Sequence, residues 1–141
     1  MPKISIHRRK ESINSLANYL VYIDGEKIGG IANGETKEFD TIAGQHTICI
    51  KIWWVSSPTL SFDINDNETK IFKVGGFKYG NWLMPLTLGI IVLHLILNNA
   101  IGFKYLILLV IPTAVIIFYY LTIGHNKYLT LKDYSNNWSE L

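Results

Sequence analysis

One long apolar stretch constrains this chain more than any other feature. Between residues 82 and 124 the only Lys, Arg, Asp or Glu is Lys104, whereas the residues before it mix charged and apolar side chains throughout. A helix needs about 20 apolar residues to cross the hydrocarbon core of a bilayer. Two segments, 82–99 and 105–124, come close to that length. We therefore predict two membrane spans joined by a short turn.

The alternative is that both segments are buried helices of a soluble protein. A polar partner of about eighty residues has too little surface to surround two such helices, which makes this alternative the weaker one. The short connection 98–104 turns a helical hairpin and leaves both termini on one side. Lysines flank that side at positions 70, 73, 78, 127 and 132. The positive-inside rule therefore predicts a multi-pass membrane protein with cytoplasmic termini.

Two residues within these segments are candidates for an intramembrane function. His94 is the only side chain there that titrates near neutral pH, and ionisable groups inside a bilayer are usually functional. The alternative is a neutral ring that reaches the nearby interface. Pro112 falls near the middle of the second segment, where its missing N–H should kink the helix. No second histidine or carboxylate accompanies His94, so we do not expect a proton pathway.

The first 76 residues follow a two-residue period instead. In the run 46–54, isoleucines at 48, 50 and 52 alternate with more polar residues. Similar short runs lie at 4–7, 19–23, 26–31, 37–42, 59–64 and 69–74, separated by turn dipeptides such as Asp24-Gly25 and Asn33-Gly34. We predict a small all-β antiparallel sandwich over 1–76, a membrane hairpin over 77–124 and a C-terminal tail over 125–141. In the tail, the run 128–131 either adds a strand to the sandwich or lies on the membrane surface.

The alternation in 46–54 also predicts an interaction surface. It places Trp54 in the core and leaves Trp53 beside Lys51 on the opposite face. An exposed Trp next to a Lys suits a protein partner or the bilayer interface. Trp53 and Lys51 are therefore the candidate interaction surface. The alternative is that Trp53 packs beneath the N-terminal segment 3–17.

Motifs that suggest chemistry are incomplete. The stretch 29–36 (GGIANGET) misses a phosphate-binding loop because Glu35 stands where the lysine belongs, and strands rather than a helix follow it. The acidic run 63–68 lacks the Gly and Glu of an EF-hand loop and is interpreted as a turn. His46 and Cys49, three residues apart in a strand, point to opposite faces and cannot share a metal ion. We predict no catalytic residue, no metal site and no cofactor.

The charge distribution does not suggest a nucleic-acid partner. The formal net charge is +2, and the one basic cluster, residues 7–10 (HRRK), is short and followed directly by Glu11. We interpret this cluster as a solvated turn. The single cysteine, Cys49, excludes an intramolecular disulfide and favours a reducing compartment.

A turn pattern within residues 19–55 carries a family resemblance. Its elements are an Asp-Gly turn, a glycine that ends the next short strand, and a later Gly-x-His-x-Ile-x-Ile run: Asp24, Gly25, Gly29, Gly44, His46, Ile48 and Ile50. The segment resembles a PEGA-type repeat and the related carboxypeptidase-regulatory-like domains, although the Pro-Glu-Gly-Ala sequence itself is absent. The resemblance implies a non-catalytic β-sandwich attached to a membrane or surface protein, with a binding or spacer role.

These observations together predict a non-catalytic integral membrane protein. Its cytoplasmic sandwich, tethered to the hairpin through Gly75-Gly76, would bind a protein partner or anchor one at the lipid bilayer. The alternative is a small accessory subunit or an oligomeric transport-related element, in which packed hairpins of several copies place His94 and Pro112 along a path. An enzyme is the third hypothesis, which the lack of a convergent acid, base and nucleophile disfavours.

Overall fold

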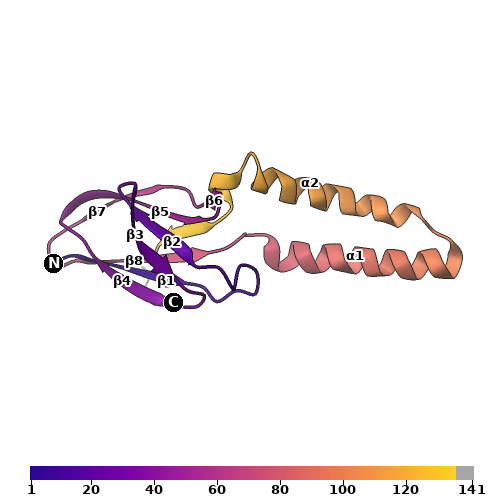
Figure 1. Ribbon diagram of the computed structural model, residues 1–141, viewed down its shortest axis with the longest axis horizontal. Coiled ribbons are helices and arrows are strands. Elements are labelled where there is room, and N and C mark those ends of the chain that lie inside the picture. The colour runs from indigo at the N-terminus through magenta and orange to yellow at the C-terminus, as the bar shows by residue number, and fades with distance from the viewer. Residues whose placement is uncertain (136–141) are drawn as a thin grey trace.

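The computed structural model describes residues 1–135 as a β-sandwich from which two helices project at one end (Figure 1). The first sheet has the order β4 (Thr36–Asp40), β1 (Lys3–Arg8), β8 (Thr69–Gly75), β9 (Thr130–Asp133). The second has the order β3 (Glu26–Ile31), β2 (Tyr19–Ile23), β5 (Gly44–Ile52), β6 (Val55–Ser56), with β7 (Leu60–Ile64) also paired to β5. The predicted β-sandwich is confirmed.

Two features of the pairing differ from a simple antiparallel sandwich of residues 1–76. Strands β1 and β8 pair in parallel, with Ile6 opposite Phe72, which is possible because most of the sandwich separates them in sequence. Strand β9 pairs with β8 after the helices, so the chain returns to the sandwich. Of the two expectations for 128–131, the added strand is the correct one. The helices are therefore an insertion between two neighbouring strands, and the rest of the predicted tail, 136–141, lies outside the described residues.

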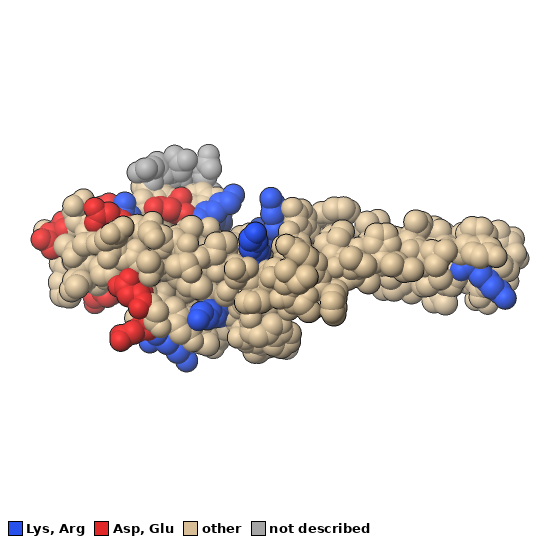
Figure 2. Space-filling model, turned by 90° about the horizontal axis from the view of Figure 1, so that it is seen from above, with Lys and Arg blue, Asp and Glu red and all other residues tan. Residues whose placement is uncertain are grey.

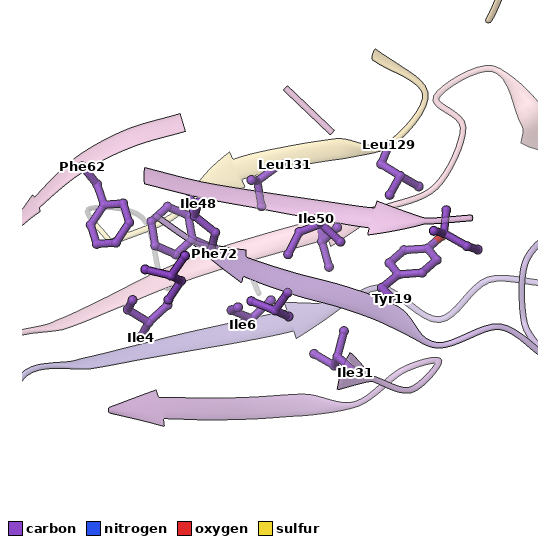
Figure 3. Packing of buried hydrophobic residues seen from close by; sticks show 14 of the residues in the cluster. Ile4, Ile6, Tyr19, Ile31, Ile48, Ile50, Phe62, Phe72, Leu129 and Leu131 are labelled. Carbon is purple, nitrogen blue, oxygen red and sulfur yellow. The ribbon is translucent and has the colours of Figure 1, made fainter. Parts of the chain in front are cut away.

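The core follows from the two-residue period. Alternate residues of β1, β2 and β5 point between the sheets, as Figure 3 shows for Ile4, Ile6, Ile48 and Ile50, each of which is fully buried. Phe62 and Phe72 close the same layer in an edge-to-face contact, with ring centroids 5.1 Å apart. Burying an isoleucine side chain of this size stabilises a fold by about 1.5–3 kcal/mol. The alternation of apolar residues along the strands therefore accounts for both the strands and the core between the sheets.

The prediction that Trp54 faces the core is wrong. Strand β5 ends at Ile52, and Trp53 and Trp54 form a two-residue turn that pairs Ile52 with Val55 of β6. Trp53 adopts a left-handed conformation with φ of 50°, and Trp54 is 66% exposed. Val55, 4% exposed, takes the core position. The alternation stops because the chain reverses, and neither tryptophan is a residue that normally marks such a turn.

The two projecting helices lie side by side and run in opposite directions (Figure 1). Helix α1 (Gly80–Ile101) has 22 residues, which corresponds to about 33 Å. By length and composition α1 could cross a membrane, and no residue in its most apolar stretch of 18 residues is buried within the structure. The return begins with a 3₁₀ segment, η1 (Tyr105–Leu109), continues as α2 (Val110–Leu121) and is followed by the short 3₁₀ turn η2 (His125–Lys127). Its helical part, Tyr105–Leu121, is apolar but shorter than α1.

Candidate functional site

The end of the sandwich that carries the helices, which we call the junction, is held by a network of hydrogen bonds around Glu11. One carboxylate oxygen of Glu11 accepts a hydrogen bond from the Gly76 amide, and the other accepts one from the Tyr19 hydroxyl at 3.0 Å. The Asn33 side chain bonds both the amide and the carbonyl of Glu11, at 2.9 and 2.8 Å. A Cβ at position 76 would collide with the Glu11 carboxylate. Gly76, in the predicted Gly75-Gly76 tether, is therefore held to the sandwich at the point where the chain leaves for the helices.

Beneath this network lies Arg8, which is fully buried. Its guanidinium donates hydrogen bonds to the carbonyls of Ala17 (2.6 Å), Ile31 (3.1 Å) and Asn14 (2.8 Å). It also stacks on Tyr19, 3.5 Å from the ring centroid. Burial of this ring, together with the neighbouring Glu11, raises the pKa of Tyr19. The interpretation of residues 7–10 as a solvated turn is thus wrong for Arg8, whose role is structural.

The candidate interaction surface lies at the same junction. The rings of Trp53 and Trp54 stack with centroids 6.1 Å apart, and the Trp54 indole N–H donates to the Leu121 carbonyl at the end of α2, at 3.2 Å. Trp53 is 72% exposed and borders a hollow formed with residues 12–17, so it lies beside the N-terminal segment without being covered by it. Lys51 instead lies over the ring of Tyr22, at 4.4 Å from its centroid. The tryptophan pair is therefore the exposed apolar part of the surface.

A second polar cluster lies at the opposite end of the sandwich. His46 is buried, and its two ring nitrogens face the Asp24 carboxylate at 2.5 Å and the Ile42 carbonyl at 3.0 Å. Since both partners are acceptors, the arrangement suits the protonated imidazolium. The hydrogen bond to Asp24 raises the pKa of His46, and the same bond lowers the pKa of Asp24. Asp24 also accepts a hydrogen bond from the Thr47 amide at 2.8 Å, so the cluster fixes the β2–β3 turn to β5.

This pair predicts a pH-dependent contribution to stability. A raised histidine pKa stabilises the fold below the ordinary value of about 6.5 and loses that effect as pH rises through the folded-state pKa. A lowered aspartate pKa acts above about 3.9, so the two overlap between about pH 4 and 6.5. We expect the stability difference between the parent and His46→Gln to be largest near pH 5 and smaller at pH 8. Since the Asp24 side chain is 49% exposed, the pH-dependent part of this difference should reach about 1 kcal/mol at most.

The measurement is chemical denaturation of the full chain in neutral detergent at both pH values, with Gln45→Ala as a control at the neighbouring exposed position. A parent–variant difference that grows from pH 5 to pH 8 would contradict the assignment of a charged pair.

The structure separates the two intramembrane candidates from the rest of the site. His94 lies in α1 and Pro112 in α2, each seven residues from the loop end of its helical segment. The Nδ1 atom of His94 is buried and has no hydrogen-bond partner among residues 1–135. Pro112 lies in the first turn of α2, directly after the 3₁₀ segment, where a missing N–H costs little. The expected kink within one continuous helix is thus replaced by a change of winding before Pro112.

The incomplete motifs form turns. The Glu35 carboxylate accepts a hydrogen bond from the Ala32 amide at 2.7 Å, and Glu68 accepts one from the Asn65 amide at 2.9 Å and pairs with Lys70 at 3.0 Å. Within residues 1–135, no group of three or more His, Cys, Asp or Glu side chains could hold a metal ion. Glu35 and Glu68 are thus engaged in closing turns.

Two residues of the turn pattern that carries the family resemblance, Asp24 and His46, are in direct contact. This contact gives a physical reason for an Asp-Gly turn and a later histidine to occur in one chain. The family assignment itself stays a prediction. Comparisons with protein-family models, curated proteins and solved structures find no match for this chain.

Proposed function

We propose that this chain is a non-catalytic membrane protein: residues 77–124 form a two-span hairpin, and the cytoplasmic sandwich binds or anchors a protein partner at the bilayer. The observation that carries the proposal is the apolar surface of the helices. Large apolar side chains on both helices are exposed along their length: Leu86, Leu88, Val92, Leu93, Leu95, Ile96, Ile107, Ile111, Val115 and Phe118. Monomeric soluble proteins rarely expose a continuous apolar surface of this size. A bilayer is the environment that covers it on all sides.

The helix lengths are compatible with two spans. The 17 helical residues from Tyr105 to Leu121 include five in 3₁₀ winding, so they extend about 28 Å, against about 33 Å for α1. The hydrocarbon core of a bilayer is about 30 Å thick. Helical winding also satisfies most backbone groups internally, which a lipid environment requires.

Aromatic residues mark both ends of the hairpin. Tyr79, Trp82, Tyr119 and Tyr120 line one crevice between the helices at the junction. At the loop end, Phe103 and Tyr105 are in edge-to-face contact, with centroids 6.1 Å apart. Tyr and Trp concentrate at the two interfaces of a bilayer because one part of each ring is apolar and the other polar. This distribution supports a hairpin whose ends lie at the two interfaces.

The sandwich is electrically asymmetric along the same axis. Figure 2 shows acidic side chains on the part of the sandwich away from the helices, and basic side chains where the helices leave it. The strand directions explain this, because the turns after β2, β4 and β7 lie at the far end. Those turns and their flanks carry Asp24, Asp40, Asp63, Asp66 and Glu68. A basic junction facing the anionic cytoplasmic leaflet agrees with the positive-inside rule.

A second candidate function is an oligomeric, transport-related element. The observation that favours it is the buried Nδ1 atom of His94, for which another hairpin could supply a hydrogen-bond partner. Cross-linking in native membranes separates the candidates. A discrete oligomer of this chain that His94→Leu disrupts favours the second candidate, and a complex with a different protein that His94→Leu leaves intact favours the first.

Topology is the direct test of the main proposal. In a Cys49→Ser background, we expect a cysteine at Ser12 to react with a membrane-impermeant maleimide only after the membrane is permeabilised. A cysteine at Asn99, near the loop end of α1, should react in intact cells. The parent chain should also remain in the membrane pellet after alkaline carbonate extraction. Labelling of Ser12→Cys in intact cells would show that the sandwich lies on the opposite side of the membrane from the one proposed. Release of the chain by carbonate would rule out the membrane hairpin.

A further inference from the structure

A basic groove lies at the junction, next to the edge strand β9. It has a volume of about 470 Å³ and is lined by five cationic side chains, Arg9, Lys73, Lys78, Lys127 and Lys132, together with Tyr134. They come from three separate parts of the chain: strand β1 and its exit, the β8–α1 segment, and η2 with β9. Figure 2 shows basic side chains at the surface where the helices begin. The fold thus gathers charges that are dispersed in the sequence.

The groove holds more positive charge than its surroundings neutralise. Arg9 is paired with Glu11 at 3.7 Å, but within residues 1–135 none of the four lysines has a carboxylate within 4 Å. Asp133, the neighbour of Lys132, instead accepts hydrogen bonds from Ser135, at 2.8 Å from its amide. Lys73 and Lys132 stand directly opposite each other on β8 and β9. Like charges in such a cross-strand pair are destabilising, so an anion between them would relieve a cost built into the sheet.

The position of the groove indicates where that anion comes from. Lys78 lies two residues before α1 begins, and Lys127 lies at the end of η2, just after the helices return. The residue after Lys78 is Tyr79, which lines the apolar crevice of about 500 Å³ between the helices. A ligand with a phosphate group and an acyl chain matches a basic groove beside an apolar crevice. A free phosphate would use the groove alone.

We propose that this groove binds the phosphate-bearing headgroup of an anionic phospholipid from the leaflet in which the junction lies. The inference rests on the proposed membrane hairpin, because only an inserted hairpin brings the groove to headgroup level. Basic residues near a membrane surface are attracted to anionic lipid. A groove that gathers four lysines without a carboxylate partner among residues 1–135 adds geometry to that attraction. The lipid would hold the sandwich at a fixed orientation to the bilayer.

The test uses the full chain purified in neutral detergent, with native mass spectrometry to count retained lipid and to derive an apparent Kd. The probes are dioctanoyl phosphatidic acid, dioctanoyl phosphatidylcholine and inorganic phosphate. We expect the parent to retain phosphatidic acid in preference to phosphatidylcholine. The triple variant Lys73→Gln, Lys127→Gln, Lys132→Gln should bind phosphatidic acid more weakly by about tenfold or more. Inorganic phosphate should neither be retained nor compete.

The matched control removes three lysines outside the groove, Lys3→Gln, Lys27→Gln and Lys37→Gln, and so has the same net charge. Equal weakening in the control would reduce the effect to general electrostatics and overturn the proposal. Equal retention of both lipids, or competition by inorganic phosphate, would overturn the assignment of an anionic lipid. Circular dichroism verifies that both variants fold. Carbonate extraction of the same variants tests the hairpin separately. If the triple variant stays in the membrane and binds phosphatidic acid as the parent does, this inference is contradicted and the proposed membrane hairpin is not.

Discussion

Arg8→Met is expected to lower the free energy of unfolding by about 3–5 kcal/mol, because each buried polar group left without its hydrogen-bond partner costs about 1–3 kcal/mol. The guanidinium is the hydrogen-bond donor to three carbonyls, those of Asn14, Ala17 and Ile31. Methionine fills a similar volume but offers no donor, so the Ile31 carbonyl loses this partner in a buried setting and the other two lose it in a partly buried one. The cation–π contact with Tyr19 is lost as well. Because two of these carbonyls belong to the segment 9–18, that segment should detach from the junction first.

The measurement is chemical denaturation of the full chain in neutral detergent, monitored by near-ultraviolet circular dichroism. Arg9→Met is the matched control, since Arg9 is the next residue, carries the same charge and has a side chain that is 47% exposed. Its loss should cost about 1 kcal/mol or less. Arg8→Lys should fall between the two, because one ammonium group cannot reach three carbonyls with the geometry of a guanidinium. Equal effects of Arg8→Met and Arg9→Met would show that the buried network contributes little.

The misplacement of Arg8 in the sequence analysis has an identifiable cause. A cluster of four basic residues suggested a solvated turn, but Ile4, Ile6 and Arg8 share the two-residue period of β1. Continuing that period by one more step places Arg8 on the buried face. Periodicity was therefore the better guide, and residue type was the misleading one. What no local pattern gives is the set of carbonyls that makes this burial possible, because they come from two other segments, the loop 9–18 and strand β3.

The same distinction explains the other successes and failures. The run 46–54 correctly predicted Ile48, Ile50 and Ile52 as core because a strand repeats one geometric rule. The prediction misplaced Trp54 because the chain reverses after Ile52, which ends the two-residue alternation. The Trp-Trp turn contains no glycine, asparagine or aspartate, the residues from which such a turn is normally predicted. The parallel pairing of β1 with β8 and the groove beside β9 depend on which distant segments become neighbours. Short stretches of the sequence do not indicate which distant segments will become neighbours.

The second large effect concerns the helices: Val92→Arg should prevent stable membrane insertion of α1. Val92 is the thirteenth of 22 residues and is 48% exposed, so its side chain points away from the hairpin at mid-depth. An arginine at the centre of a spanning helix costs about 2.5–3.5 kcal/mol, on the order of a hundredfold in the insertion equilibrium. We expect most of the variant to leave the membrane pellet during alkaline carbonate extraction, or to be degraded in cells.

The position-matched control is Ile101→Arg, at the last residue of α1, where the exposed fraction is 72%. A long basic side chain there reaches the interface, so the control should stay in the pellet with the parent. The contrast between the two positions shows whether the helix lies in a bilayer or in water, because a helix exposed to water tolerates arginine equally at both positions. Two variants that behave alike would contradict the membrane hairpin. A soluble oligomer that buries the helices could also reject Val92→Arg, but its parent chain would not resist carbonate.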